Sequence, residues 1–296
     1  MQNMVRGDKS KRRIDPSWDF RAENTKFSTH GFHTYPAMMI PQIACRLIQA
    51  YKIPSACVLD PFLGSGTVLV ESKTDSDISR AIGIDMNPLA LLVSRAKTTP
   101  LDPNILLQTH NDLITKSTQT LEDIQHGRYK ICLPDFPNID FWFKKDVKVK
   151  LAVIKEQIQK IKDDNIRNFF LGAFSETVRK VSNTRSGEFK LYRIAAEKLE
   201  SHNPDVLLAF KKKSLDNIHA MEEFYSKAEK CKVEIHEANS QHLSFIKEPT
   251  VNLVVTSPPY GDSRTTVAYG QFSRLALQWL DFEHDFVKDI DKTSLG

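Results

Sequence analysis

The sequence feature that most constrains this chain is a glycine-containing turn that follows a short apolar segment. Residues 56–59 read Ala-Cys-Val-Leu, and Asp60-Pro61-Phe62-Leu63-Gly64-Ser65-Gly66-Thr67 comes directly after them. A continuously apolar run of this length is typical of a strand in a parallel sheet covered on both faces. Glycines after such a strand let a ligand approach the backbone, and a following helix offers N–H groups to a carboxylate or phosphate. The segment predicts an α/β fold with a ligand site at a strand end.

The residues around this turn argue against two common nucleotide-binding motifs. A nicotinamide-binding fingerprint carries a third glycine where this chain has Leu69, and a P-loop carries a lysine directly after its last glycine, where this chain has Thr67. Asp85 follows the next apolar segment, residues 81–84. An acidic residue at that strand end can accept hydrogen bonds from two ribose hydroxyls. A helix-capping carboxylate is the alternative interpretation of Asp85.

Residues 27–99 show helix and strand patterns in alternation. Apolar residues at helical spacing predict a helix over about 39–50, and a second helix begins at Thr67. Asn87-Pro88 places a capping side chain before a proline at the first helical position, which predicts a third helix. Helices that connect strands in this way make right-handed crossovers between parallel strands.

The pattern changes after residue 99. Apolar residues at helical spacing predict a mainly helical segment, with stripes over 147–161, 166–181 and 207–228. Two strand patterns then return, at 233–238 and 251–255, and a last helix contains Leu275 and Trp279. We divide the chain into a flexible basic arm (1–26), a cofactor-binding half (27–99), a helical insertion (100–230) and a part with a second motif (231–296).

Composition excludes several classes of protein. No run of about 18 apolar residues predicts a membrane-spanning helix, and the first residues lack the apolar stretch of a secretory signal. The four cysteines are scattered, which favours buried free thiols in a reducing cytoplasm over disulfides or a zinc site. The histidines show no ligand spacing, and His30 and His33 have no carboxylate or cysteine nearby in the sequence. We therefore expect no membrane and no metal.

A second motif follows the strand predicted over 251–255. It reads Thr256-Ser257-Pro258-Pro259-Tyr260. The two prolines stiffen the turn and leave carbonyl oxygens as acceptors. An exocyclic amine of a nucleic-acid base needs acceptors such as the Ser257 hydroxyl and the Pro258 carbonyl, and Tyr260 offers a ring on which a base can stack. The alternative interpretation is a simple turn or a docking peptide.

These motifs resemble those of the amino-methyltransferases that modify DNA bases. Asp60–Thr67 resembles their motif I, and residues 253–260 resemble motif IV in the Ser-Pro-Pro-Tyr form typical of N4-cytosine enzymes. Phe32-His33-Thr34-Tyr35-Pro36-Ala37 resembles motif X, which helps hold the methionine part of the cofactor. Glu237-Ala238-Asn239-Ser240 stands at motif III, with Asn239 in place of the usual acid. The resemblance covers residues 27–98 and 233–280.

The resemblance implies a Rossmann-like α/β sheet dependent on S-adenosylmethionine, with a large helical insertion. It implies that Ser257, Pro258, Pro259 and Tyr260 form the catalytic motif. It places the cofactor against a larger set of residues, namely Thr34, Tyr35, Pro36, Asp60, Pro61, Phe62, Gly64, Ser65, Gly66, Thr67, Asp85, Met86, Asn239 and Ser240. The amine would attack the methyl group directly on a flipped-out base, without a covalent enzyme intermediate. No cysteine of the chain follows a proline, as the nucleophile of C5-cytosine enzymes does.

The implied function is site-specific methylation of cytosine N4 in double-stranded DNA, in a bacterial restriction-modification system. Three alternatives remain open. N6-adenine methylation is separated from it by Ser257 alone. Guanine-N2 methylation of tRNA uses similar motifs, although residues 1–30 are too short for the RNA-binding domain that those enzymes carry. The third is a non-catalytic cofactor-binding or DNA-recognition subunit of a split enzyme.

The charge of the chain is mildly positive, at +4, and its distribution matters more than its sum. Basic residues are in excess near the N-terminus and in the helical insertion. A solvated helical surface accounts for such an excess, but a phosphate-contacting surface becomes plausible beside a base-modifying motif. We expect the contacts with DNA to come from Arg179, Lys180, Arg185, Lys190 and Arg193.

About 36 residues follow the second motif, whereas three further strands with their helices need roughly 80–120 residues. No earlier segment resembles the missing motifs V to VIII. We therefore expect a truncated product, or one subunit of a split enzyme that a second polypeptide completes. Such a chain, purified alone, would bind its cofactor weakly or aggregate, because an apolar sheet edge is a liability.

Overall fold

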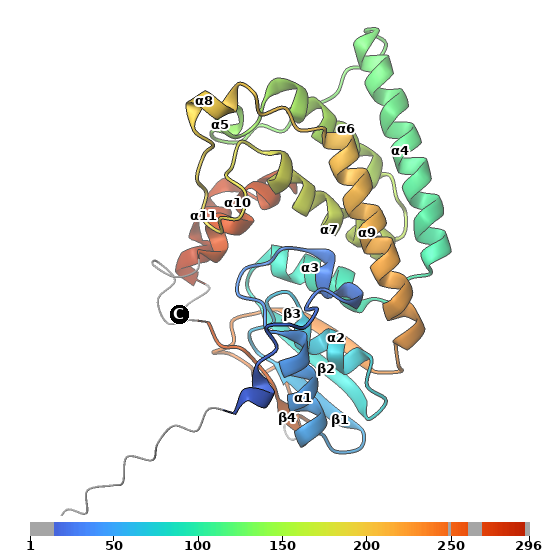
Figure 1. Cartoon of the computed structure of the whole chain (residues 1–296), viewed down its shortest axis with the longest axis vertical. Helices are drawn as coiled ribbons and strands as arrows, with labels where there is room; N and C mark the ends of the chain where they lie inside the picture. The colour runs from blue at the N-terminus through green and yellow to red at the C-terminus, as the bar shows by residue number, and fades with distance from the viewer. Residues whose placement is uncertain (1–14, 248–249, 260–267, 294–296) are drawn as a thin grey trace, which may run out of the picture.

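The computed structural model describes residues 15–247, 250–259 and 268–293. A parallel sheet with its flanking helices forms one half of the structure, and a layer of longer helices forms the other (Figure 1). The last described helices, α10 (Tyr269–Trp279) and α11 (His284–Thr293), return to the helical layer. The C-terminal part of the chain therefore contributes to both layers, because β3 (Lys232–Glu237) and β4 (Leu253–Val254) belong to the sheet.

Four strands form the sheet. They are β1 (Ala56–Asp60), β2 (Ile78–Asp85), β3 (Lys232–Glu237) and β4 (Leu253–Val254), in the order β3-β2-β1-β4, and every pair is parallel. The parallel α/β arrangement predicted from the sequence is confirmed. β4 is shorter than predicted, but the amides of Asn252 and Val255 also donate to carbonyls of β1, at 3.0 and 3.1 Å. The carboxyl ends of β1, β2 and β4 consequently meet at one edge.

Three helices cover this sheet, and all three were predicted. They are α1 (Pro41–Tyr51), α2 (Thr67–Lys73) and α3 (Pro88–Thr98). α3 begins where expected, because the Asn87 side chain accepts from the amide of Leu89 at 3.0 Å and Pro88 needs no amide partner. Buried residues of α1, α2 and the strands form a core between them, including Ile48, Val58 and Leu69.

The helical layer has its own core. It contains α4 (Pro103–Gln125), α5 (Ile139–Trp142), α6 (Lys145–Gln159), α7 (Asp164–Val181), α8 (Ala196–Leu199) and α9 (Val206–Lys227). The apolar stripes predicted over 147–161 and 166–181 lie on α6 and α7 and face this core. The third stripe faces it only in part: Phe210, Ile218 and Met221 of α9 are buried there, whereas Tyr225 is exposed. Trp279 of α10 is fully buried among Phe136, Phe143 and Phe174. Its burial ties α10 to this layer.

Two short 3₁₀ helices precede α1. The first, η1 (Pro16–Trp18), contacts α1, where the Arg46 guanidinium stacks on Trp18 at 4.0 Å. The second, η2 (Ser28–Phe32), lies between the two layers. Side chains of α9 hold η2, because Lys213 donates to the Gly31 carbonyl at 2.8 Å and Glu223 accepts from the Ser28 amide at 2.9 Å.

His30 and His33 have no carboxylate nearby in the sequence, but the fold supplies one to each. His30 Nε2 lies 2.7 Å from Glu71 of α2, and His33 Nδ1 lies 3.3 Å from Glu176 of α7. Both partners are distant in sequence, so local spacing could not reveal them. Burial lowers the pKa of His30 and of His33, against the opposing effect of the carboxylates. Within the described residues, no group of three or more potential ligands could hold a metal ion.

The cysteines were expected to be buried free thiols, and the structure agrees for two of them. All four cysteines are free thiols; Cys57 and Cys231 are buried, whereas Cys45 is half-buried and Cys132 is exposed. The expectation of burial was therefore wrong for Cys132 and only partly met for Cys45. In the part of the chain that the structure describes, no helix is both long and apolar enough to span a membrane.

The glycine at position 66 generates a prediction about stability. Gly66 has φ +78°, and an added Cβ would lie 2.9 Å from the Cβ of Ser94 in α3. Gly66→Ala should lower the free energy of unfolding by about 1–2 kcal/mol for the left-handed backbone and by about 1–3 kcal/mol more for the overpacking. Urea unfolding measures this change.

Gly127 provides a matched control, since its φ is +70° and no atom lies within 4 Å of an added Cβ. Gly127→Ala should show only the backbone contribution. Equal losses in the two variants would contradict the close approach of α3 to the turn.

Candidate functional site

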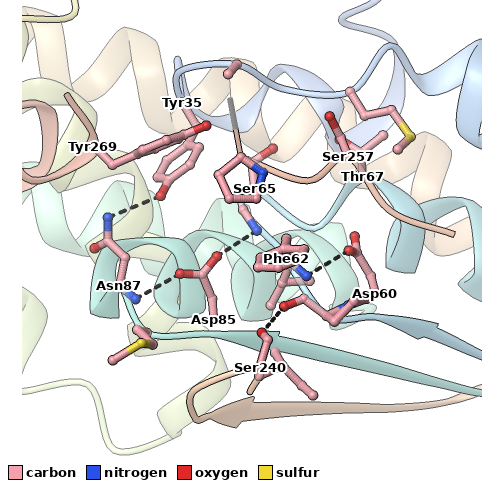
Figure 2. Close-up of a pocket in the computed structure, with 18 of the residues that line it drawn as sticks. Tyr35, Asp60, Phe62, Ser65, Thr67, Asp85, Asn87, Ser240, Ser257 and Tyr269 are labelled. Atoms are coloured by element: carbon pink, nitrogen blue, oxygen red, sulfur yellow. Dashed lines mark hydrogen bonds between the residues drawn. The ribbon is translucent and has the colours of Figure 1, made fainter. Parts of the chain in front are cut away.

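A pocket of about 240 Å³ opens at the carboxyl ends of β1, β2 and β4. Its walls come from segments that are far apart in the chain (Figure 2). The lining residues include most of those expected to bind a cofactor: Tyr35, Pro36, Asp60, Pro61, Phe62, Gly64, Ser65, Thr67, Asp85, Met86, Asn239 and Ser240. Ligands of open α/β sheets bind at such strand ends.

The glycine turn is held from two sides. The Gly64 amide donates to Asp85 at 2.8 Å, and the Gly64 carbonyl accepts from the Ser94 hydroxyl of α3 at 3.0 Å. A Cβ on Gly64 would be 3.7 Å from a ring carbon of Tyr35, another residue of the pocket lining. The turn therefore presents backbone, rather than side chain, to this part of the pocket.

Asp85 ends β2 and lines the pocket. Its two carboxylate oxygens accept from the amides of Gly64 and Asn87, both at 2.8 Å (Figure 2). Asn87, and not Asp85, supplies the side-chain cap of α3. Burial raises the pKa of Asp85 to about 6, although the backbone hydrogen bonds act in the opposite direction. Each carboxylate oxygen retains a further lone pair for a ligand hydroxyl.

A hydrogen bond joins the two motifs. The Thr256 hydroxyl donates to Asp60 Oδ1 at 2.7 Å, and the same oxygen accepts from the Phe62 amide at 3.1 Å. Asp60 is only 3% exposed. Burial raises its pKa to about 7, and the charge of Asp85 acts in the same direction. The turn after β1 and the segment after β4 are thereby fixed to each other.

The four residues of the second motif differ in position. Ser257 and Pro259 line the pocket, whereas Pro258 is exposed and is not part of the lining. Ser257 lies on the same side of the pocket as Thr67 in Figure 2. Tyr260 lies outside the described residues. The structure thus places part of the expected amine-binding turn beside the glycine turn.

Two of the expected cofactor residues lie outside the lining. Thr34 donates from its amide and its hydroxyl to Glu176 of α7, at 3.0 and 2.7 Å. Gly66 is the N-cap residue of α2. Both residues are adjacent to lining residues, Tyr35 and Ser65. Thr34 and Gly66 therefore adjoin the pocket lining without being part of it.

Other lining residues were missed by the sequence analysis. Asn87 was interpreted only as a helix cap, yet its side-chain amide donates to the Tyr35 hydroxyl at 3.1 Å and to Ser273 at 2.8 Å. Tyr269 comes from α10, with its ring 6.1 Å from that of Tyr35. No local signal marks Tyr269. The remaining missed residues are Ala37, Met38, Met39, Leu63, Val68, Ile84 and Gln241.

The five basic residues expected to contact DNA cluster at the end of α7 and in the loop that follows it. The Arg179 guanidinium stacks on Phe272 at 4.3 Å and donates to the Phe272 and Glu188 carbonyls. The Arg193 guanidinium stacks on Phe141 at 4.0 Å. Lys180 and Arg185 are exposed, and Lys190 and Arg193 are half-buried.

Comparisons with known proteins identify relatives. A family model described as a DNA methylase (N6_N4_Mtase) matches residues 1–94. The Type II methyltransferase M.MvaI of Kocuria varians is 45% identical over 290 residues, which cover 94% of this chain and 63% of that protein. The Type II methyltransferase M.MjaII of Methanocaldococcus jannaschii is 32% identical over 97 residues, 33% of this chain and 18% of that protein. No solved structure matches the chain.

The parallel sheet with a pocket at its strand ends is a Rossmann-like methyltransferase fold. Within that class, the chain belongs to the DNA methyltransferase family. The chain spans less than two thirds of the length of both relatives named above. The family uses S-adenosylmethionine as its methyl donor.

The buried carboxyl of Asp60 generates a prediction about pH. Its pKa is raised from 3.8 to about 7 in the folded protein, so between these values the folded state binds a proton that the unfolded state has lost. The stabilising contribution of Asp60 is therefore complete below about pH 4 and falls as the pH rises toward 7. The fall is roughly 1.4 kcal/mol for each pH unit in this window.

Asp60→Asn should remove this contribution without removing the acceptor for Thr256. The difference in free energy of unfolding between the parent chain and the variant should shrink as pH rises from 4 to 7. Chemical denaturation at a series of pH values measures it. A difference that stays constant over this range would contradict the raised pKa of Asp60.

Proposed function

We propose that the pocket binds S-adenosylmethionine and that the chain methylates an exocyclic amine of a DNA base. The observation that carries the proposal is the hydrogen bond between Thr256 and Asp60, which joins the segment after β4 to the glycine turn after β1. A methyltransferase needs these two sites side by side, because the methyl group passes directly from the cofactor to the amine.

The chemistry of the pocket fits this cofactor. Asp85 offers carboxylate oxygens to the ribose hydroxyls, and Phe62, which is 40% exposed, offers an aromatic face to the adenine. Asn239 and Ser240 add polar groups at the same wall, where Ser240 donates to the Pro61 carbonyl. The Tyr35 segment lies across the glycine turn and would hold the methionine part. When bound, the cofactor supplies an activated methyl group on its sulfonium.

The second motif would hold the acceptor amine. The Ser257 hydroxyl and the Pro258 carbonyl are acceptors, so they would take the hydrogens of the amine and orient its lone pair toward the methyl group. Ser257 lines the pocket, which supports this role. Tyr260 would stack on the base. Positioning and electrostatics carry the reaction in this mechanism, and no side chain forms a covalent intermediate.

The substrate that we propose is cytosine N4 in double-stranded DNA, in a restriction-modification setting. The support comes from Ser257 in the second motif and from the similarity to M.MvaI, a Type II methyltransferase. The helical insertion, residues 100–230, would carry target recognition. Lys180 and Arg185 are its best candidates for phosphate contacts, because they are the two exposed residues among the five basic ones. The Arg185 guanidinium also lies 5.9 Å from the Tyr192 ring and donates to the Arg193 carbonyl at 3.2 Å.

Transfer of labelled methyl groups tests the proposal. The chain is incubated with labelled S-adenosylmethionine and duplex DNA, and the digested nucleosides are identified by mass spectrometry. We expect N4-methylcytosine, and Ser257→Ala should lower the rate by about 10- to 100-fold because one acceptor for the amine is lost. Ser201→Ala, at an exposed serine of the helical layer, is the control.

Two outcomes would change the assignment. N6-methyladenine as the product would replace cytosine N4 by the adenine alternative. Cofactor binding without any methylated product would favour the subunit alternative, in which a second polypeptide completes the enzyme.

The salt dependence of DNA binding tests the proposed surface. Each lost phosphate contact reduces the slope of log K against log salt by about 0.9. Lys180→Ala combined with Arg185→Ala should therefore reduce the slope by about 2. The matched control is Lys116→Ala combined with Lys130→Ala. Both lysines are exposed, Lys116 lies on α4, and their replacement removes the same charge from another surface. An equal reduction in both double variants would contradict a specific surface on the α7–α8 loop.

A further inference from the structure

Behind the glycine turn lies a buried lysine that the proposed mechanism does not use. Lys97, in the last turn of α3, is only 1% exposed, and it is among the largest fully buried side chains. It does not line the pocket. Its polar neighbour is the Ser65 hydroxyl, 3.5 Å from Nζ. Ser65 is also buried, but it lines the pocket.

The position of Lys97 follows from the way α3 contacts the turn. Ser94 and Lys97 are three residues apart, so they lie on the same face of α3. Ser94 donates to the Gly64 carbonyl and lies against Gly66. Lys97, on the same face, reaches Ser65 between those two glycines. The face of α3 that fixes the glycine turn through Ser94 therefore also places the Lys97 amino group next to it.

The ammonium group of Lys97 has no close counter-ion. Among the described residues, no carboxylate forms an ion pair with Lys97 within 4.0 Å. Glu71 is the carboxylate whose charge affects Lys97 most, but Glu71 already contacts His30 at 2.7 Å. Burial lowers the pKa of Lys97 to about 7. An unpaired buried amine destabilises a fold, so an apolar side chain would serve packing better.

We propose that Lys97 is a positioning residue for the carboxylate of S-adenosylmethionine and that it acts through the Ser65 hydroxyl. A hydroxyl can accept a hydrogen bond from Lys97 and donate one to an anion in the pocket. The carboxylate is the only anionic group of this cofactor. It would supply the negative charge that the buried ammonium lacks, in surroundings where water screens little. This inference rests on the proposed cofactor.

Two ligands separate this role from a structural one. S-adenosylmethionine and its decarboxylated form differ only in the carboxylate, and their dissociation constants are measured by calorimetry. We expect the parent chain to prefer S-adenosylmethionine. Lys97→Met, which keeps an unbranched side chain only one atom shorter and removes its charge, should reduce that preference by about 10-fold. The affinity for the decarboxylated form should not fall.

A matched control variant defines the comparison. Lys213→Met removes another lysine, a half-buried one whose amino group donates to the Gly31 carbonyl outside the pocket, and should leave the preference unchanged. Thermal unfolding of Lys97→Met should show no loss of stability, because the variant removes a buried amine that has no carboxylate partner.

The relay through Ser65 is tested by a double-mutant cycle. Ser65→Ala should reduce the preference for the carboxylate, and the combined variant should lose little more than either alone. If Lys97→Met does not fold, Ser65→Ala alone carries the same test. Equal losses for both ligands in Lys97→Met, or an unchanged preference, would overturn the role of Lys97. A parent chain that binds neither ligand would instead contradict the proposed cofactor.

Discussion

The hydrogen bond between Thr256 and Asp60 connects residues 196 positions apart, and the geometry of the pocket depends on it. β4 has only two residues in regular pairing, so backbone bonds alone hold it weakly. The Asn252 side chain adds a second anchor by accepting from the Cys57 amide at 2.9 Å. These polar contacts place Ser257 beside the glycine turn, and in the reaction that we propose a shift of even about 1 Å between the two would impair methyl transfer.

The same region concentrates buried charge in a way that stability alone does not explain. Asp60, Asp85 and Lys97 are all largely desolvated, and burial shifts the pKa of each toward the neutral form. Perturbed groups of this kind cluster at functional sites. The surrounding structure compensates through backbone amides at the carboxylates and through the packing of α3 against the turn. Stability is thus lowered locally at the pocket that we propose to bind the cofactor.

The sequence predicted the parts of the structure that depend on local pattern. The strand before Asp60, the cap at Asn87 and the stripes on α6 and α7 follow from spacing and residue type, and all are confirmed. Long-range partners were not predictable. Glu71 and Glu176 meet the two histidines through tertiary packing, and Tyr269 reaches the pocket from α10. α4 was not located individually, because much of its surface is exposed and its apolar stripe is sparse.

α10 physically links the pocket to the loop that carries the proposed DNA contacts. Phe272 of α10 lies 6.0 Å from the Tyr35 ring on the pocket side and 6.1 Å from the Phe189 ring on the loop side. The Arg179 guanidinium covers Phe272, and Gln271 accepts from the Leu191 amide at 3.3 Å. A displacement of this loop would therefore move α10 against Tyr35. Arg179 therefore connects the α7–α8 loop with α10 through its contacts with Phe272 and Glu188.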